Sequence, residues 1–490
     1  MTLLLIACTS GGVPADAPAA ATTDVSSVQP PNIIYILADD LGYGDLGSFG
    51  QQTVQTPHLD AMAAGGLRLT QHYAGSTVCA PSRCVLMTGK HVGNAYIRGN
   101  NRGDDGYELP IPEDEVFVSE LLKDAGYHTA CIGKWGLGGP GSTSHPNAVG
   151  FDYFYGFLNH GHAHNHYPDY LWRNDEQVPT GNVMTDASRL DSLGKGVAVE
   201  RVAYAGDLFF REAGAFLDRA SEDDKPFFLY LALSVPHTNN EAPRLLKHMP
   251  EEARPQRGQE VPSLGRYANE DWPGPQIGTA AMITRMDAGV GELLARLQAL
   301  GIAENTLIIF SSDNGPHAEG GNDPGFFDSN GPLRGIKRDL YEGGIRVPTI
   351  AYWPGTIEPG RLSPHLSGFQ DLLPTACDLA DIEPPAGIDG ISFVPTLLGS
   401  DQQPEHDYLY WEFFEQGGKQ AVRWGDWKGI RLKAQQDRES AIMLFDLTND
   451  LGEQSNVADQ HPEVVAHIRR LMDQARTPSG IDRFRFRWEQ

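Results

Sequence analysis

Short runs of consecutive apolar residues alternate with helical patterns over most of the chain. The apolar runs occupy residues 33–37, 127–132, 227–235, 307–311 and 348–353. Continuous runs of this kind are typical of strands that are buried on both faces of a parallel sheet. Between them, apolar residues recur at helical spacing, most clearly over residues 280–300, and Gly301 follows as a stop signal. The pattern predicts an α/β sandwich, in which helices flank a large, mostly parallel or mixed central sheet.

The pattern changes near residue 400. Residues 408–413, 427–432 and 442–446 predict short strands, and residues 463–475 predict a closing helix. We therefore expect three parts. They are a flexible tether over residues 1–31, a main domain over residues 32–399, and a smaller C-terminal α+β subdomain with a short antiparallel sheet over residues 400–490.

The first residues combine a short apolar run with a cysteine. Residues 3–7 are far too few to span a bilayer. Residues 5–8, Leu-Ile-Ala-Cys, resemble a bacterial lipobox, in which the cysteine is lipidated, although the basic segment that opens a signal peptide is missing. We expect a bacterial protein in the periplasm or at the cell surface, held by an N-terminal lipid anchor. The alternative is a soluble N-terminus without fixed structure.

The composition narrows the functional classes. A hydrophobic content of 40% and a charged content of 21% are ordinary for a globular protein. The formal net charge of −26 argues against a nucleic-acid-binding protein, which needs a basic face to replace the counterions of the phosphates. The five cysteines form no CxxC pair, and they are too few for a disulfide scaffold in so long a chain.

A glycine motif follows the first apolar run, but its context argues against a nucleotide-binding site. Gly42, Gly44 and Gly47 match GxGxxG, which alone would indicate a dinucleotide-binding fold. However, no helical period opens at the last glycine. The preceding Asp39 and Asp40 would also repel a pyrophosphate unless a metal ion lay between them. We therefore expect no nucleotide cofactor.

Acidic residues close two of the predicted strands. Asp39 and Asp40 follow residues 33–37, and Asp313 and Asn314 follow residues 307–311. Ligands of α/β sheets bind at the carboxyl ends of the strands. Three carboxylates and an amide oxygen suit a hard cation such as Ca²⁺ or Mg²⁺. The alternative is a set of capping or solvated side chains.

The segment Cys79-Ala-Pro-Ser-Arg83 is the most specific signal in the chain. Proline is pre-organised for the first turn of a helix, and the apolar residues 85–87 continue a helical segment. Cys79 would then lie at a helix N-terminus, where the dipole favours negative charge. A structural cysteine before a helix is the alternative for any single motif of this form.

Several motifs occur together and in order. They are IIYILADDLGYGD (residues 33–45), CAPSR followed by LMTGK (79–90), GKWGLG (133–138), SVPH (234–237), SSDNGPH (311–317) and YEGGIRVP (341–348). In this combination the chain resembles the type I sulfatases of the alkaline phosphatase superfamily, from residue 32 to nearly the C-terminus. The resemblance implies that the main domain is catalytic and has the alkaline-phosphatase-like fold.

The resemblance also implies a mechanism. Cys79 would be oxidised to formylglycine by a formylglycine-generating enzyme, and the hydrated aldehyde would attack the sulfur of a sulfate ester. A cation, Ca²⁺ rather than Mg²⁺, would polarise the sulfate. His237 would protonate the leaving oxygen. By the same resemblance, the cation ligands are Asp39, Asp40, Asp313 and Asn314, and the basic residues that neutralise the transferring group are Arg83, Lys134 and Lys337.

One position departs from the family pattern. Family members commonly have histidine directly after the Lys-Trp pair, but this chain has Gly136. Either a subfamily works without this histidine, or another residue fills the gap, for which the alternating histidines His160, His162, His164 and His166 are the candidates. The tract could instead bind a metal, but the aromatic and polar residues that follow favour the wall of a sugar-binding pocket. We expect substrate contacts from His164, Asn165, His166, Asp169, Arg173, His317 and Arg334.

The sequence thus predicts a sulfatase that hydrolyses a sulfate ester of a sulfated saccharide, with galactose or N-acetylgalactosamine sulfate as the favoured sugar. One alternative is a phosphonate or phosphate ester hydrolase of the same superfamily, which is disfavoured because only one metal's ligands are recognised. The other is a catalytically silent lipoprotein that binds sulfated glycans. The intact CAPSR motif and the complete ligand set argue against it.

Overall fold

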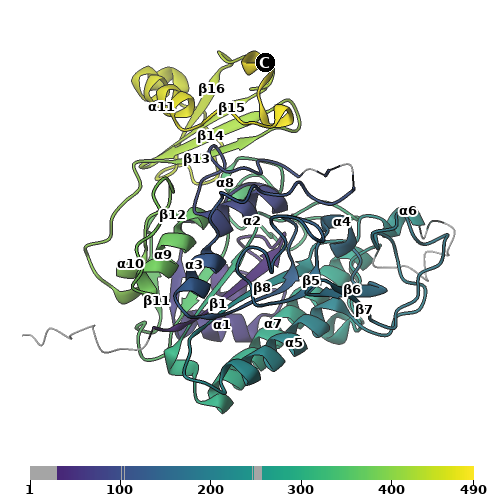
Figure 1. Cartoon of the computed structure of the whole chain (residues 1–490). Coiled ribbons are helices and arrows are strands. Elements are labelled where there is room, and N and C mark those ends of the chain that lie inside the picture. The colour runs from purple at the N-terminus through teal and green to yellow at the C-terminus, as the bar shows by residue number, and fades with distance from the viewer. Residues whose placement is uncertain (1–29, 101, 104, 246, 248–256) are drawn as a thin grey trace, which may run out of the picture.

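A ten-stranded mixed sheet forms the centre of the protein (Figure 1). The computed structural model describes residues 30–490 except 101, 104, 246 and 248–256. The strand order is β11-β2-β10-β9-β1-β8-β4-β5-β6-β7. Their bounds are β1 Asn32–Asp39, β2 Leu67–Leu69, β4 His128–Lys134, β5 Tyr153–Phe157, β6 Tyr170–Arg173, β7 Glu176–Pro179, β8 Phe227–Pro236, β9 Thr306–Ser312, β10 Thr349–Tyr352 and β11 Arg361–Ser363.

The middle of this sheet is parallel. Strand β1 pairs in parallel with β8 and β9, and β4 pairs in parallel with β8 and β5. Antiparallel pairing begins outside this group, at β10 on one side and at β6 and β7 on the other. The five apolar runs recognised in the sequence became β1, β4, β8, β9 and β10. The predicted α/β fold with a mixed central sheet is therefore confirmed.

Helices cover both faces of the sheet (Figure 1). Side chains of α2, α3 and α9 belong to the core on one face, and side chains of α1, α5 and α7 belong to the core on the other. Alternate residues of β1 enter the two cores, as the two-residue period of a strand requires. The helices are α1 Pro57–Ala64, α2 Cys79–Thr88, α3 Val118–Asp124, α4 His160–Ala163, α5 Ala205–Ala220, α6 Ala242–Leu245, α7 Gly274–Leu300, α8 Glu342–Ile345, α9 Leu372–Leu379, α10 Val394–Leu398 and α11 Pro462–Gln474.

A four-stranded antiparallel sheet lies at the C-terminal end of the chain. Its strands are β13 Leu409–Phe413, β14 Lys419–Trp424, β15 Trp427–Leu432 and β16 Ile442–Asp446, and α11 packs on it. The sequence predicted three of these strands and the helix but missed β14. Trp411 and Phe413 belong to the same apolar core as Tyr35 of β1, so the two sheets share buried surface. A domain boundary at residue 400 stays a prediction.

Two short strands, β3 (His72–Tyr73) and β12 (Ser367–Gly368), pair in parallel beside the main sheet. No helix in the described part of the chain is long and apolar enough to cross a membrane. The predicted lipobox and residues 1–29 of the predicted tether lie outside the described residues.

Candidate active site

Four neighbouring strands end at one edge of the sheet, and each supplies a polar side chain there. Strand β1 ends with Asp39 and β4 with Lys134, while His237 follows β8 and Asp313 follows β9. The parallel pairing of these strands brings their carboxyl ends together, as expected for a site on an α/β sheet.

The chain turns sharply after β1 so that Asp40 joins the same group. Asp40 has a φ of 68°, in the left-handed region that aspartate tolerates better than most residues. Its backbone N–H donates to Oδ1 of Asp313 at 3.1 Å, and the N–H of Leu41 donates to Oγ of Ser312 at 2.8 Å. These two hydrogen bonds to the end of β9 stabilise the turn.

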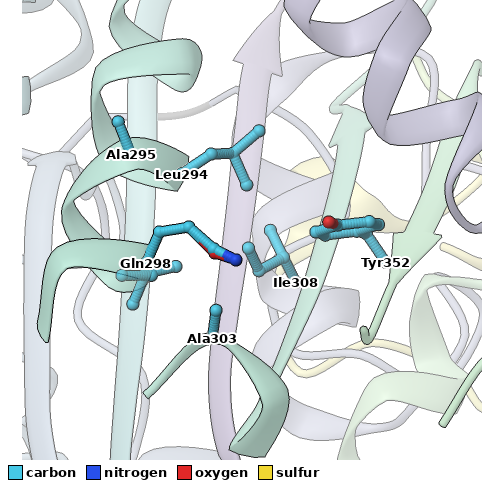
Figure 2. A pocket seen from close by; sticks show the side chains of 7 residues that line it. Leu294, Ala295, Gln298, Ala303, Ile308 and Tyr352 are labelled. Carbon is cyan, nitrogen blue, oxygen red and sulfur yellow. The ribbon is translucent and has the colours of Figure 1, made fainter. Parts of the chain in front are cut away.

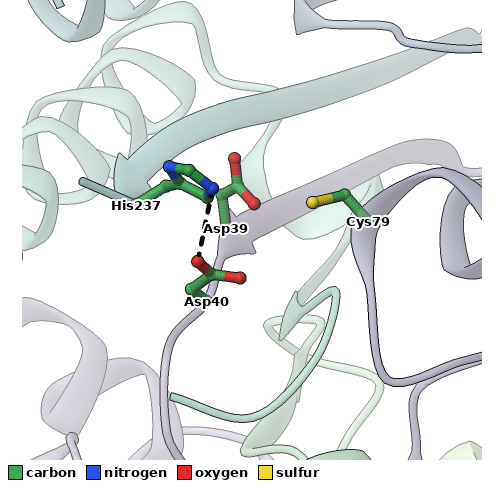
Figure 3. Close-up of side chains that lie close together, drawn as sticks. All are labelled: Asp39, Asp40, Cys79 and His237. Atoms are coloured by element: carbon green, nitrogen blue, oxygen red, sulfur yellow. Dashed lines mark ion pairs between the residues drawn. The ribbon is translucent and has the colours of Figure 1, made fainter. Parts of the chain in front are cut away.

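Cys79 opens α2 and faces the acidic pair. Figure 3 shows its sulfur directed toward the end of β1, where Asp39 and Asp40 lie, with His237 at the end of β8. One ligand atom from each of these four buried residues lies within 4.8 Å of the others. Burial raises the pKa of the Cys79 thiol to about 12, although Lys134 opposes the shift. An unmodified Cys79 is therefore a neutral thiol, which is a poor nucleophile.

Three buried cations compensate the carboxylates. Lys134 Nζ donates to Oδ2 of Asp39 at 2.6 Å, and Lys337 Nζ donates to Oδ2 of Asp40 at 2.8 Å. Arg83, one helical turn after Cys79, donates from Nη2 and Nε to Oδ2 of Asp313 at 2.8 and 3.2 Å. These cations are fixed in place, so they provide preorganised positive charge for an anionic group.

Two oxygen atoms of the cluster fit a hard cation. Oδ1 of Asp39 and Oδ1 of Asn314 are buried and have no hydrogen-bond partner among the described residues. The Asn314 amide group donates to Oδ1 of Asp40 at 2.7 Å, which leaves the Asn314 oxygen for another partner. Burial and the neighbouring Asp39 raise the pKa of Asp313 to about 7, and a divalent cation would favour its ionised form. These donors suit Ca²⁺ or Mg²⁺.

Three histidines that the sequence assigned to substrate binding surround His237. The His164 ring stacks on the His237 ring, with centroids 4.6 Å apart. His166 Nε2 donates to the backbone oxygen of His237 at 2.8 Å, and His317 Nε2 donates to that of Pro236 at 3.3 Å. Nδ1 of His237 donates to the Thr238 oxygen at 2.7 Å, so its Nε2 faces Oδ2 of Asp40, 3.5 Å away.

Comparison with known proteins agrees with this geometry. A family profile described as Sulfatase matches residues 31–382, more than half of the chain. The chain belongs to the sulfatase family. A second profile, described as N-sulphoglucosamine sulphohydrolase, C-terminal, matches residues 331–477. The resemblance found in the sequence motifs is confirmed, and the protein is a sulfuric ester hydrolase.

This sulfatase is similar to enzymes and structures from several sources. It is 30% identical to N-acetylgalactosamine-6-sulfatase of Canis lupus familiaris over 482 residues, which cover 90% of this chain and 84% of that protein. It is 33% identical to arylsulfatase A of Bos taurus over 490 residues, covering 92% and 88%. The solved structure of Ps i-CgsB in complex with k-i-k-neocarrahexaose has a TM-score of 0.71 and 28% identity, covering 91% and 92%. These matches support the sulfatase hypothesis over the two alternatives.

Two other residues that were predicted to bind substrate, Arg173 and Arg334, are paired with other groups of the protein. Arg173 is exposed and pairs with Glu212 and with the Tyr153 hydroxyl, at the amino end of β5, opposite the edge where Lys134 ends β4. The Arg334 guanidinium donates to the Glu453 backbone oxygen at 2.6 Å and lies 4.0 Å from the centroid of the Tyr341 ring.

Asp169 and Asn165 precede β6 and are held mainly by residues that follow β7. Asp169 forms an ion pair with Arg189. Asn165 is buried, where it accepts from the Tyr167 N–H at 3.1 Å and donates to the Met184 sulfur at 3.3 Å. Both contacts stabilise the loop that carries the histidine tract.

The sequence missed two polar residues, one at this site and one that binds a histidine of the predicted tract. Ser312 joins the ends of β1 and β9, because its hydroxyl accepts from the Leu41 N–H and donates to the backbone oxygen of Asn314 at 2.9 Å. Glu108 comes from a loop without periodic pattern and binds His160. Only their tertiary contacts reveal them. A separate cavity of about 170 Å³ lies between α7, β9 and β10, and no charged side chain lines it (Figure 2).

Proposed function

We propose that this sulfatase removes sulfate from a sulfated saccharide by means of a formylglycine derived from Cys79 and a bound Ca²⁺ ion. The observation that carries the proposal is the placement of Cys79. It is buried at the start of α2, and its sulfur lies within 4.8 Å of ligand atoms of Asp39, Asp40 and His237. A neutral thiol there explains why this position would need chemical conversion before it can act.

The formylglycine would supply, once hydrated, a hydroxyl nucleophile at residue 79. Its formation requires a formylglycine-generating enzyme as a partner during maturation. A hydroxyl at this position lies at the N-terminus of α2, where the helix dipole stabilises developing negative charge. The buried Lys134 and Lys337 act on the same position, since both favour the ionised form of residue 79.

The cation would be held by the oxygens of Asp39, Asp40, Asp313 and Asn314. Bound there, it would act as a Lewis acid on a sulfate oxygen. An all-oxygen ligand set in which two oxygens lack other partners favours Ca²⁺, and Mg²⁺ is the second choice because it retains several waters.

The other side chains of the cluster would compensate charge and donate a proton. Lys134, Lys337 and Arg83 compensate the charge of the sulfate group. Burial and Lys337 lower the pKa of His237, but an arriving sulfate ester brings negative charge that raises it again. His237 Nε2 would then carry the proton that passes to the leaving sugar oxygen.

The proposed substrate follows from the relatives and from the shape of the tract near His237. A relative is named N-acetylgalactosamine-6-sulfatase, and a solved neighbour binds a neocarrahexaose. We therefore favour a galactose-configured sugar sulfate. His164 and His317 lie beside His237, with ring centroids 4.6 and 5.8 Å from its own, and under this proposal they would contact the leaving sugar. A periplasmic or cell-surface location with an N-terminal lipid anchor belongs to the same proposal.

The test is a panel of sulfated sugars assayed with protein from a host that makes formylglycine. We expect turnover of galactose 6-sulfate or N-acetylgalactosamine 6-sulfate to exceed that of glucose-configured sulfates and of phosphate esters. Cys79→Ala should abolish it. Cys84→Ala is the matched control, because Cys84 is a buried cysteine of the same helix and should be dispensable. Substantial turnover by Cys79→Ala would contradict the assignment of the nucleophile.

A further inference from the structure

The space beside Gly136 is occupied by another residue. Gly136 has a φ of 72°, and a Cβ atom added to it would lie 2.1 Å from Cε1 and 2.6 Å from both nitrogens of His160. The imidazole of His160 thus fills the volume in which a side chain at position 136 would begin. Position 136 is two residues after Lys134, whose ammonium group reaches Asp39.

A buried carboxylate fixes this imidazole. Oε1 of Glu108 lies 2.7 Å from Nδ1 of His160 and accepts the His160 backbone N–H at 3.1 Å. Both side chains are almost completely buried. Burial would raise the pKa of Glu108, but these contacts with His160 outweigh it and hold the pKa below its usual value. Glu108 is therefore a carboxylate, and Nδ1 of His160 is the donor.

The other ring nitrogen is left without a partner. Nε2 of His160 is buried and forms no hydrogen bond among the described residues. Because Nδ1 carries the proton, Nε2 has a free lone pair. Burial, assisted by Lys134 and Arg83 and opposed by Glu108, lowers the pKa of His160 to about 4, so the ring is neutral near pH 7.

The loop that holds Glu108 also reaches the nucleophile. Asn100 accepts the backbone N–H of Ala80, next to Cys79, at 3.0 Å, and Glu108 follows in the same loop. The imidazole therefore lies beside Gly136 and is bound by Glu108, eight residues after the Asn100 that contacts the first turn of α2.

We propose that His160, positioned by Glu108, is the catalytic base of this sulfatase. The inference rests on the proposed function. Once residue 79 carries a hydroxyl, the lone pair of Nε2 would form a new N–H bond to its proton, and the electron pair of the broken O–H bond would stay on that oxygen. Glu108 stabilises the imidazolium that results, and the ring later returns the proton to solvent.

The first test compares two histidines of the same short helix. His160→Gln should lower kcat on the order of 100-fold, the loss typical of a missing acid or base. His162→Gln is the matched control, since its ring is also buried but packs on Phe157 and Tyr170, and kcat should stay within threefold of the parent. Retention of kcat by His160→Gln would overturn the proposal.

An exchange of the residues at positions 136 and 160 tests whether the two side chains would occupy the same volume. In the double variant His160→Gly with Gly136→His, the imidazole enters the same space from the other side. We expect its kcat to exceed that of His160→Gly at least tenfold. The recovery would be incomplete, because histidine at a φ of 72° is strained. If the double variant is no more active than His160→Gly, an imidazole at position 136 does not replace that of His160, which would contradict the proposal.

A spectroscopic measurement separates this inference from the proposed function. In unconverted protein with ¹⁵N-labelled histidine, the His160 resonances are assigned by their loss in His160→Gln. We expect a protonated Nδ1 and an unprotonated Nε2 at pH 7, whether or not Cys79 is converted. A protonated Nε2 would overturn the role of His160 as a base. A dead Cys79→Ala beside a fully active His160→Gln would refute only this inference.

Discussion

His164 and His237 stack face to face, with ring centroids 4.6 Å apart and planes inclined by 18°. His164 is itself held by Glu241 at 3.1 Å, and Glu241 is paired with Lys195 at 2.9 Å. His237 is thus supported on its ring face as well as through its backbone. Such support is expected for a group that must meet a leaving oxygen in one orientation.

A first prediction concerns the leaving group. His237→Ala should lower kcat/KM for a sugar sulfate on the order of 100-fold or more, because a sugar alkoxide needs a proton to leave. An activated aryl sulfate needs little protonation and should lose far less. Steady-state kinetics on both substrates provide the measurement. Equal losses on the two substrates would remove His237 as the general acid.

A second prediction concerns the cation. Adding Ca²⁺ to chelator-treated protein should raise Tm, since a ligand at 100 times its Kd stabilises the folded state by about 2.7 kcal/mol. Asp39→Asn and Asn314→Ala should weaken this response, because their unpartnered oxygens would be altered or lost.

Asp287→Asn is the control for the cation measurement. Asp287 is a buried carboxylate on α7 that accepts the Leu59 N–H at 2.7 Å, far in sequence from the cluster. This variant should have a lower Tm but the same Ca²⁺-dependent increase. A normal increase in Asp39→Asn would show that the ion binds elsewhere.

A third prediction separates two basic residues that the sequence placed together at the site. Lys337→Met removes a buried cation from Asp40 and should lower kcat/KM more than 100-fold, on the order of a lost electrostatic contact in a catalytic site. Arg173→Ala removes an exposed partner of Glu212 and should leave kcat/KM within twofold of the parent. A large loss of kcat/KM in Arg173→Ala would show that Arg173 contributes to substrate binding after all.

A fourth prediction concerns the contact between the two sheets. Lys428 of β15 donates to Oε1 of Glu342 of α8 at 2.7 Å, and neither side chain is exposed. Lys428→Met should reduce the free energy of unfolding by about 3 kcal/mol, because it removes one of the two cations that pair with the buried Glu342 carboxylate, the other being Arg346 at 3.3 Å. Lys225→Met, at an exposed position, should change it by about 0.5 kcal/mol or less. Urea unfolding measures the change in the free energy of unfolding for each variant. Equal changes in Lys428→Met and Lys225→Met would contradict a stabilising buried ion pair.

The proximity of these polar residues could be predicted because strand ends and motifs are local features of the sequence. Asp39, Asp313 and His237 each follow an apolar run, and parallel pairing brings such ends together. The position of Arg173 could not be predicted in this way. It ends β6, which runs antiparallel to β5, so its side chain lies at the opposite edge of the sheet.

Other features could not be predicted from the sequence, for different physical reasons. Strand β14 contains Lys419, Gln420 and Arg423 among its apolar residues, and their burial depends on tertiary partners such as Asp339 for Lys419. The contact between Glu108 and His160 joins a loop to the four-residue helix α4, and both segments are too short to show a periodic pattern. The glycine at position 136 was visible in the sequence, but only the structure shows that His160 fills the space beside it.

The central claim is that residue 79 acts as a formylglycine, and mass spectrometry of the peptide that contains Cys79 tests it most directly. The protein should come from its native host or from one with a formylglycine-generating enzyme. Conversion predicts a mass that matches replacement of the thiol by an aldehyde, together with sulfatase activity that scales with the converted fraction. An unmodified Cys79 in fully active protein would contradict the account.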